Sequence, residues 1–142
     1  MGYKRLIPCI FIAEGKAVKW FNDKSPLSDD VVGLAKYYSD YGADELLIFD
    51  LSDSDEEHDE CMNLMRKIHH SIRIPMVAGG NVKRLEDVKK IIYAGAKRAI
   101  LNFSKPDSLK IVEEAAKRFG KEKIAVSLND FDALFKHQHL IE

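Results

Sequence analysis

Short apolar runs alternate along the chain with longer segments in which apolar residues recur every three or four positions. The first pattern is typical of parallel strands buried on both faces, and the second of amphipathic helices. The runs predict strands over residues 5–12, 45–51, 75–78, 98–102 and 124–128. The periodic segments predict helices over residues 30–41, 57–70, 85–94, 107–119 and 131–137.

Small residues mark the ends of the predicted helices. Gly42, Gly95 and Gly120 each follow an apolar helical face and precede a predicted strand. Glycine is favoured there because it adopts the left-handed conformation that ends many helices. At the other end, Ser28 or Asp29 is expected to cap the first helix through its side-chain oxygen.

Residues 41–52 and 94–104 form an internal repeat, since both read Gly-Ala followed by a polar pair, an apolar run and a final serine. The repeat suggests a duplicated βα unit. Strands and helices that alternate in this way predict an α/β fold with a parallel sheet and flanking helices. Eight such units close a TIM-type barrel of typically ~250 residues. We therefore expect a (βα)4-5 half-barrel, a single domain over residues 1–142 that is either complete or the N-terminal part of a longer polypeptide.

The composition adds few constraints on function. Of 142 residues, 46% are hydrophobic and 32% charged, and the formal net charge of −1 provides no basic field for nucleic acid. The apolar runs are too short to cross a membrane and no secretory signal is recognisable, so we expect a cytoplasmic protein. Cys9 and Cys61 are expected to be reduced and packed as small apolar residues.

The acidic segment Asp53–Glu60 suggests calcium, but it lacks the glycine and glutamate that an EF-hand loop requires. We interpret it as a helix start whose carboxylates interact favourably with the helix dipole. His58 and Cys61 share a face of that helix, yet no compatible set of four zinc ligands accompanies them. We expect no metal and no cofactor.

Two neighbouring predicted strands end in small or polar residues. Because ligands of α/β proteins bind at the carboxyl ends of parallel strands, these two ends predict a binding site. Backbone N–H groups can surround a phosphate there, and glycine permits close approach. The alternative is a plain tight turn without a ligand. The candidate phosphate-binding residues are Gly79, Gly80, Asn81, Asn102, Phe103 and Ser104.

Four segments occur together in this order: Arg5-Leu-Ile-Pro-Cys-Ile, Gly15-(x)3-Lys19, Tyr41-Gly-Ala-Asp-Glu-Leu and Ile74-Pro-Met-Val-Ala-Gly-Gly-Asn-Val. In order and spacing they resemble the cyclase subunit of imidazole glycerol phosphate synthase, in the histidine-biosynthesis isomerase and cyclase superfamily. The resemblance runs from about residue 4 to residue 129 and covers only the N-terminal half of that family's barrel. It implies a phosphorylated ribosyl ligand, one phosphate of which the two strand ends would hold. The family has a third glycine at Asn81 and a threonine at Phe103. Because asparagine tolerates positive φ better than most residues, we expect the turn to survive at Asn81.

The resemblance places the family's two catalytic aspartates at Phe11 and Asn129. Neither residue can act as a general acid or base at neutral pH, which argues against cyclase activity. Three other residues are candidates for catalysis. Asp50 matches the acid that ends the second strand, and Lys19 matches a lysine of the long first loop. Asp130 would take the fifth-strand role after a shift of one residue.

Arg5, Glu45 and Arg98 match charged residues at the bottom of the family's barrel, where ammonia enters from a glutaminase subunit. The resemblance therefore implies a glutaminase partner, and the alternative is a set of charges that only pair and stabilise the floor. A half-barrel also leaves an open edge and an exposed inner face. We therefore expect a homo-oligomer or a missing C-terminal half.

Three functions remain open. The first is a catalytically degenerate half-barrel that binds or scaffolds ribose-phosphate ligands, of the kind found ahead of phosphoribosyl-AMP cyclohydrolase and phosphoribosyl-ATP pyrophosphohydrolase domains in histidine-pathway polypeptides. The second is an active cyclase, lyase or phosphoribosyl isomerase that dimerisation or a partner completes. The third is a pure interaction domain that uses the face of Arg5, Glu45 and Arg98.

Overall fold

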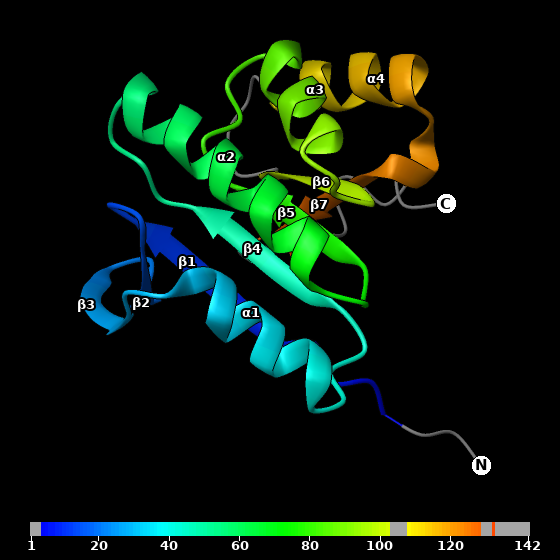
Figure 1. The fold of residues 1–142 in the computed structure, drawn as a ribbon. Helices are drawn as coiled ribbons and strands as arrows, with labels where there is room; N and C mark the ends of the chain where they lie inside the picture. Colours follow the sequence, from blue (N-terminus) through cyan, green and yellow to red (C-terminus); the bar gives the residue numbers. More distant parts are fainter. Residues whose placement is uncertain (1–3, 103–107, 129–131, 133–142) are drawn as a thin grey trace.

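The computed structural model describes residues 4–102, 108–128 and 132, and its strands form one sheet in the order β3-β2-β1-β4-β5-β6-β7 (Figure 1). The strands are β1 (Cys9–Ala13), β2 (Lys16–Trp20), β3 (Asp23–Ser28), β4 (Leu46–Asp50), β5 (Met76–Gly79), β6 (Arg98–Asn102) and β7 (Ile124–Ser127). The helices are α1 (Val31–Asp40), α2 (Asp55–Ser71), α3 (Leu85–Tyr93) and α4 (Ser108–Phe119), with a short 3-10 helix η1 (Lys121–Lys123).

The parallel part of the sheet confirms the predicted α/β fold. β1, β4, β5, β6 and β7 pair in parallel in chain order, and a helix connects each to the next. Figure 1 shows α1 to α4 on one side of the sheet. Parallel strands with helices on the outer face are the arrangement of a partial TIM-type barrel.

The main core lies between the sheet and the helices. Strand side chains alternate between the two faces, and one set of alternate residues packs under the helices. This set includes Ile10, Ile12, Leu46, Ile48, Met76, Ala78, Ala99 and Leu101, against Val31, Met65, Ile68, Val88, Ile91 and Ala115 from the helices. The opposite, inner face carries a smaller cluster of Phe11, Ala13 and Val18, with Phe49 and Leu51 packed against it.

The long first loop expected after β1 is instead a β-hairpin. β2 pairs antiparallel with β1, and β3 pairs antiparallel with β2, so the sheet extends beyond the parallel strands. β2 has only Ala17 and Val18 buried, and β3 has no buried residue. Such a polar edge strand tolerates Pro26, which cannot donate to a ladder.

Most elements begin and end within two residues of the predictions, but β1 begins at Cys9, four residues after the predicted start. Gly42, Gly95 and Gly120 have φ of 98°, 113° and 96°, so the predicted left-handed helix ends are confirmed. The cap of α1 is Asp30, whose Oδ1 accepts from Gly33 N at 2.9 Å. The prediction of Ser28 or Asp29 was therefore wrong by one or two positions, because only from Asp30 does a carboxylate reach the third helical N–H.

Other expectations were met in part. Cys61 is buried as expected, but Cys9 is exposed, because it starts β1 on the open inner face. Both cysteines are free. The helix expected over residues 131–137 lies outside the described residues apart from Asp132. In the part of the chain that the structure describes, no helix combines the length and the apolar character needed to cross a bilayer.

Candidate functional site

The carboxyl ends of the parallel strands enclose a small cavity of about 150 Å³, which we call the strand-end cavity. β6 and β7 run in register, so that Asn102 lies beside Ser127 at this edge. Typical ligand pockets have volumes of about 300–1,000 Å³. The strand-end cavity is smaller, so it suits a single small chemical group. Its lining residues are Phe49, Gly80, Asn81, Val82, Ile100, Asn102 and Ser127.

The structure brings together three of the six predicted phosphate-binding residues. Gly80, Asn81 and Asn102 all line the strand-end cavity, whereas Gly79 does not. Phe103 and Ser104 lie outside the described residues. Ser127 was missed from the sequence, although its place near the end of the predicted strand 124–128 was the signal that could have found it.

Close packing of the strand ends requires glycine at both Gly79 and Gly80, whether or not a ligand binds. A Cβ at Gly79 would come within 2.7 Å of Ile100 Cβ and of its backbone oxygen, so β5 and β6 require glycine there. Gly80 has a φ of 91°, and a Cβ on it would lie 2.7 Å from the backbone nitrogen of Asp50 and closer still to its oxygen. The Gly-Gly pair is therefore needed to bring the strand ends close together.

Asn81 completes this turn in the left-handed conformation, with a φ of 55°. The expectation that asparagine can replace a glycine here is confirmed, since asparagine tolerates positive φ better than most residues. Its Nδ2 donates to the backbone oxygen and to Oγ of Ser52, both at 2.5 Å. Asn81 thus joins the loop after β5 to the loop after β4.

Two of the three candidate catalytic residues, Asp50 and Lys19, lie among the described residues. Asp50 is 2% exposed and points toward the helices, because it alternates with Phe49 on the inner face. Its Oδ2 accepts from His58 Nδ1 at 2.5 Å, and its Oδ1 accepts from Ser52 N at 2.9 Å. Lys19 is exposed on the hairpin strand β2 rather than in a loop. Asp130 and Asn129 lie outside the described residues.

An aromatic cluster occupies the inner face near the strand ends. Phe11 is 9% exposed, with its ring centroid 5.0 Å from that of Trp20 and 5.6 Å from that of Phe49. Phe21 extends the cluster, 5.1 Å from Trp20. Edge-on and offset contacts of this kind stabilise aromatic pairs. At Phe11, Trp20 and Phe49 the inner face therefore offers apolar surface.

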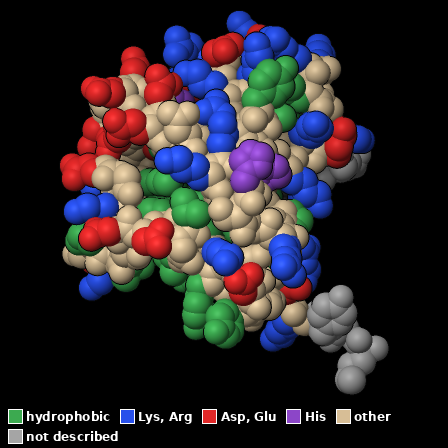
Figure 2. Space-filling model, in the orientation of Figure 1, with side chains coloured by type: hydrophobic (Ala, Val, Ile, Leu, Met, Phe, Trp, Pro, Cys, Tyr) green, Lys and Arg blue, Asp and Glu red, His purple; other side chains and the backbone are tan. Residues whose placement is uncertain are grey.

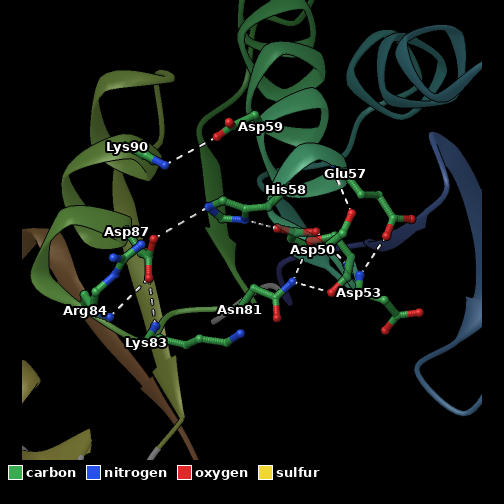
Figure 3. Close-up of polar contacts among 12 residues, drawn as sticks. Asp50, Asp53, Glu57, His58, Asp59, Asn81, Lys83, Arg84, Asp87 and Lys90 are labelled. Carbon is green, nitrogen blue, oxygen red and sulfur yellow. Dashed lines mark hydrogen bonds and ion pairs between the residues drawn. The ribbon is translucent and has the colours of Figure 1, made fainter.

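A larger cavity of about 440 Å³ lies between α2 and α3, on the helix side of the sheet; we call it the α2/α3 cleft (Figure 3). Its floor holds the buried side chains of His58 and Asp87. Its walls carry acids on the α2 side, cations on the α3 side and three uncharged residues. These are Asp53, Asp55 and Asp59; Lys83, Arg84 and Lys90; and Ser52, Ser54 and Asn81.

Neither the cleft nor its buried chemistry was predicted from the sequence. Burial raises the pKa of the Cys61 thiol, and the nearby Asp50 carboxylate raises it further. The thiol therefore stays protonated beside Asp50 and His58. Among the described residues, no group of three or more His, Cys, Asp and Glu side chains is arranged to hold a metal ion.

At the opposite end of the strands, Glu45 joins two arginines. It is 6% exposed, and its carboxylate lies 3.1 Å from Arg5 Nη2 and 3.5 Å from Arg98 Nη1. The three residues predicted to share the barrel floor do come together. The pairing accounts for the buried carboxylate, because a buried charge is stable only when it is paired.

These observations define the class of the protein: a partial TIM-type barrel with a small cavity at its strand ends and a charged floor beneath. The family model described as histidine biosynthesis protein matches residues 5–138. The chain belongs to this family.

Individual relatives agree with the family match. The imidazole glycerol phosphate synthase subunit HisF of Exiguobacterium sibiricum is 35% identical over 128 residues, or 89% of this chain and 51% of the relative. The subunits of the same name from Clostridium botulinum and Methanocaldococcus jannaschii are 35% and 33% identical, over 91% and 89% of this chain. The chain spans about half the length of the curated relatives it matches.

Proposed function

We propose that this chain is a catalytically degenerate member of the histidine biosynthesis family, which binds the phosphate of a ribosyl ligand without performing the cyclase reaction. The observation that carries the proposal is the aromatic packing of Phe11. The resemblance described above places a catalytic aspartate at this position, whereas Phe11 packs against Trp20 and Phe49. Asp50 does not replace that acid, because its carboxylate is buried under the helices.

The strand-end cavity supports the binding half of the proposal. Its size suits one phosphate group, and the turn at Gly80 and Asn81 exposes backbone close to the cavity without a bulky side chain. Asn102 and Ser127 add polar side chains from the neighbouring strands. Amide and hydroxyl donors around a glycine turn are the usual surroundings of a bound phosphate.

Calorimetric titration tests the proposal directly. Ribose 5-phosphate is expected to bind and ribose is not, and Asn102→Leu is expected to weaken binding while the exposed control Asn63→Leu on α2 is not. Absence of heat with ribose 5-phosphate would contradict the binding site. A steady-state cyclase assay is expected to show no turnover. If turnover appears and Asp130→Asn abolishes it, the chain is an active enzyme.

A second candidate function is contact with another protein, for which the glutaminase subunit implied by the family resemblance is the first choice. The observation that favours it is the floor cluster, in which the Arg5 side chain remains 57% exposed although its carboxylate partner is buried. Arg5→Glu is expected to weaken binding of a glutaminase subunit in calorimetry. Reversal of Glu45 is a poorer test, because a buried cation beside Arg5 and Arg98 would disturb the fold itself.

A further inference from the structure

The α2/α3 cleft has the size of a small-molecule site, and nothing in the proposed function uses it. Its volume of about 440 Å³ falls in the range of typical ligand pockets, about 300–1,000 Å³. It opens on the helix side of the sheet and shares Asn81 with the strand-end cavity (Figure 3). What it can bind depends on the groups that its floor presents.

The floor presents two polar atoms that face each other. His58 is 7% exposed, and its Nε2 has no hydrogen-bond partner among the described residues. Asp87 Oδ1 lies 3.7 Å from this nitrogen, which is beyond hydrogen-bond distance. The other oxygen of Asp87 is already engaged, since Oδ2 accepts from Lys83 N at 2.9 Å and from Arg84 N at 3.1 Å.

The tautomer of His58 determines whether its Nε2 donates or accepts a hydrogen bond. In the tautomer whose Nδ1 donates to the Asp50 carboxylate, 2.5 Å away, Nε2 is an acceptor. Asp87 Oδ1 is an acceptor as well. A ligand group that satisfies both must therefore donate more than one hydrogen bond, as an ammonium group with three donors can.

Charge favours the same kind of group. Asp50 and Asp87 are 2% and 4% exposed, so two buried carboxylates flank one imidazole ring. A buried carboxylate without a countercharge is costly. A ligand cation at Asp87 Oδ1 supplies that charge.

The rim of the cleft provides for an opposite charge on the ligand. Lys90 pairs with Asp59 at 3.3 Å, whereas the side chains of Lys83 and Arg84 form no ion pair within the described ranges. Both residues directly precede α3, and its amino end adds a favourable field for an anion. The cations thus lie on the α3 side of the floor atoms described above.

We propose that the α2/α3 cleft binds a small zwitterionic molecule that carries an ammonium group and a phosphate or carboxylate group. The ammonium group donates both to His58 Nε2 and to Asp87 Oδ1, and the anionic group lies at Lys83 and Arg84. This site is independent of the strand-end cavity and stands whether or not a ribose phosphate binds there.

Nuclear magnetic resonance of the full-length polypeptide with ¹⁵N-labelled histidine tests the site. The probes are phosphoethanolamine and β-alanine as zwitterions, ethyl phosphate without the ammonium group, and ethylamine without the anion. At neutral pH the zwitterions are expected to shift the Nε2 signal of His58 saturably. Loss of either charged end should weaken binding about tenfold or more. No shift at millimolar zwitterion, or equal binding of ethyl phosphate, overturns the proposal.

Variants separate the two ends of the ligand. Lys83→Gln, an exposed change, is expected to weaken phosphoethanolamine binding about tenfold and to leave ethylamine binding unchanged. His58→Gln lacks the reporting signal, so its binding is followed by calorimetry; it is expected to abolish zwitterion binding, and His70→Gln on the exposed face of α2 serves as its matched control. Because His58→Gln also alters a buried site, the probe series on the unaltered protein decides if that variant does not fold. Equal binding by all three variants contradicts the proposal.

Discussion

Gly80 and Asp50 show at the scale of single residues how tightly the strand ends are packed. Gly80 combines a left-handed backbone with a position directly against the Asp50 backbone. Gly15 has a similar φ of 74°, but a Cβ there would meet nothing within 4 Å. The two glycines therefore differ in packing but share the same conformational requirement.

Substitution of these two glycines distinguishes the cost of backbone strain from the cost of a steric clash with Asp50. Gly15→Ala is expected to lower the free energy of unfolding by about 1 kcal/mol, for the backbone alone. Gly80→Ala is expected to lower it by about 2–4 kcal/mol, because the collision with Asp50 is added. Urea denaturation measures both. Equal losses would show that the close approach to Asp50 does not matter.

Cys61 is expected to make the free energy of unfolding decrease at alkaline pH. Burial raises the pKa of its thiol in the folded state. In the unfolded chain the thiol has its ordinary pKa of about 8.5. The folded state therefore holds the proton that the unfolded state releases, and stability falls as pH rises above about 8.5.

The slope of this decline identifies the thiol. Cys61 contributes at most about 1.4 kcal/mol of lost stability per pH unit. Urea denaturation at several pH values between about 8 and 10 is expected to show a shallower slope in Cys61→Ala than in the parent chain. The comparison uses slopes, so the constant cost of the smaller side chain cancels. Unchanged slope in the variant would contradict the assignment.

Single residues also show what sequence reasoning could and could not reach. The tolerance of Asn81 for a left-handed turn follows from its own chemistry and was predicted correctly. The direction in which the Asp50 side chain points does not follow from its residue type. Alternate residues of a strand face the helix-side core and the inner face, so the direction depends on the position of the residue in the strand. A shift of one position exchanges the two faces, and only the paired register of β1 and β4 fixes it.

At the scale of elements, the start of α2 is a small network of hydrogen bonds. Ser54 caps the helix, since its Oγ accepts from Glu57 N at 3.1 Å. Glu57 in turn accepts from Asp53 N and from Glu14 N, each at 2.6 Å. The carboxylate thus ties the β1–β2 turn to the helix. Figure 2 shows the acidic side chains gathered at this end of α2. As predicted, they lie where their negative charge interacts favourably with the helix dipole.

Removal of the cap tests this network. Ser54→Ala is expected to cost about 1 kcal/mol of stability, because the N–H group of Glu57 loses its acceptor. Ser71→Ala, at the other end of the same helix, removes only a hydroxyl that donates to Lys67 O and is expected to cost less than about 0.5 kcal/mol. Thermal unfolding measures both. A similar loss at both ends would contradict the special role of Ser54.

The elements that the sequence predicted correctly are those with a strong period. Each parallel strand is an apolar run, and each described helix has a clear apolar face. The β2–β3 hairpin was missed because its strands are short, mostly exposed and interrupted by Pro26. The α2/α3 cleft was missed for another reason: its residues come from two helices and two loops, which only the packing of the chain brings together.

On the scale of the whole molecule, the inner face decides whether the chain could act as an enzyme by itself. Restoration of an acid by Phe11→Asp is expected to yield no cyclase turnover, since one carboxylate among Trp20 and Phe49 lacks the rest of a site. It is also expected to lower stability by about 3 kcal/mol or more, because it removes buried aromatic packing. Steady-state assays and urea denaturation measure the two effects, with Phe11→Leu as the apolar control. Turnover in Phe11→Asp would show that the rest of an active site is present and that the chain lacks only this acid.

The aromatic cluster has one more consequence, which concerns light emission. Trp20 is the single tryptophan of the chain, half exposed, and its ring meets Phe11 at the inner face. Indole emission moves to shorter wavelength when water is displaced from the ring. A second copy or a further domain that covers the inner face would therefore shift the fluorescence of this protein, whereas ligands of the α2/α3 cleft would leave the colour unchanged. The chain carries its own optical reporter of whether its half-barrel is closed.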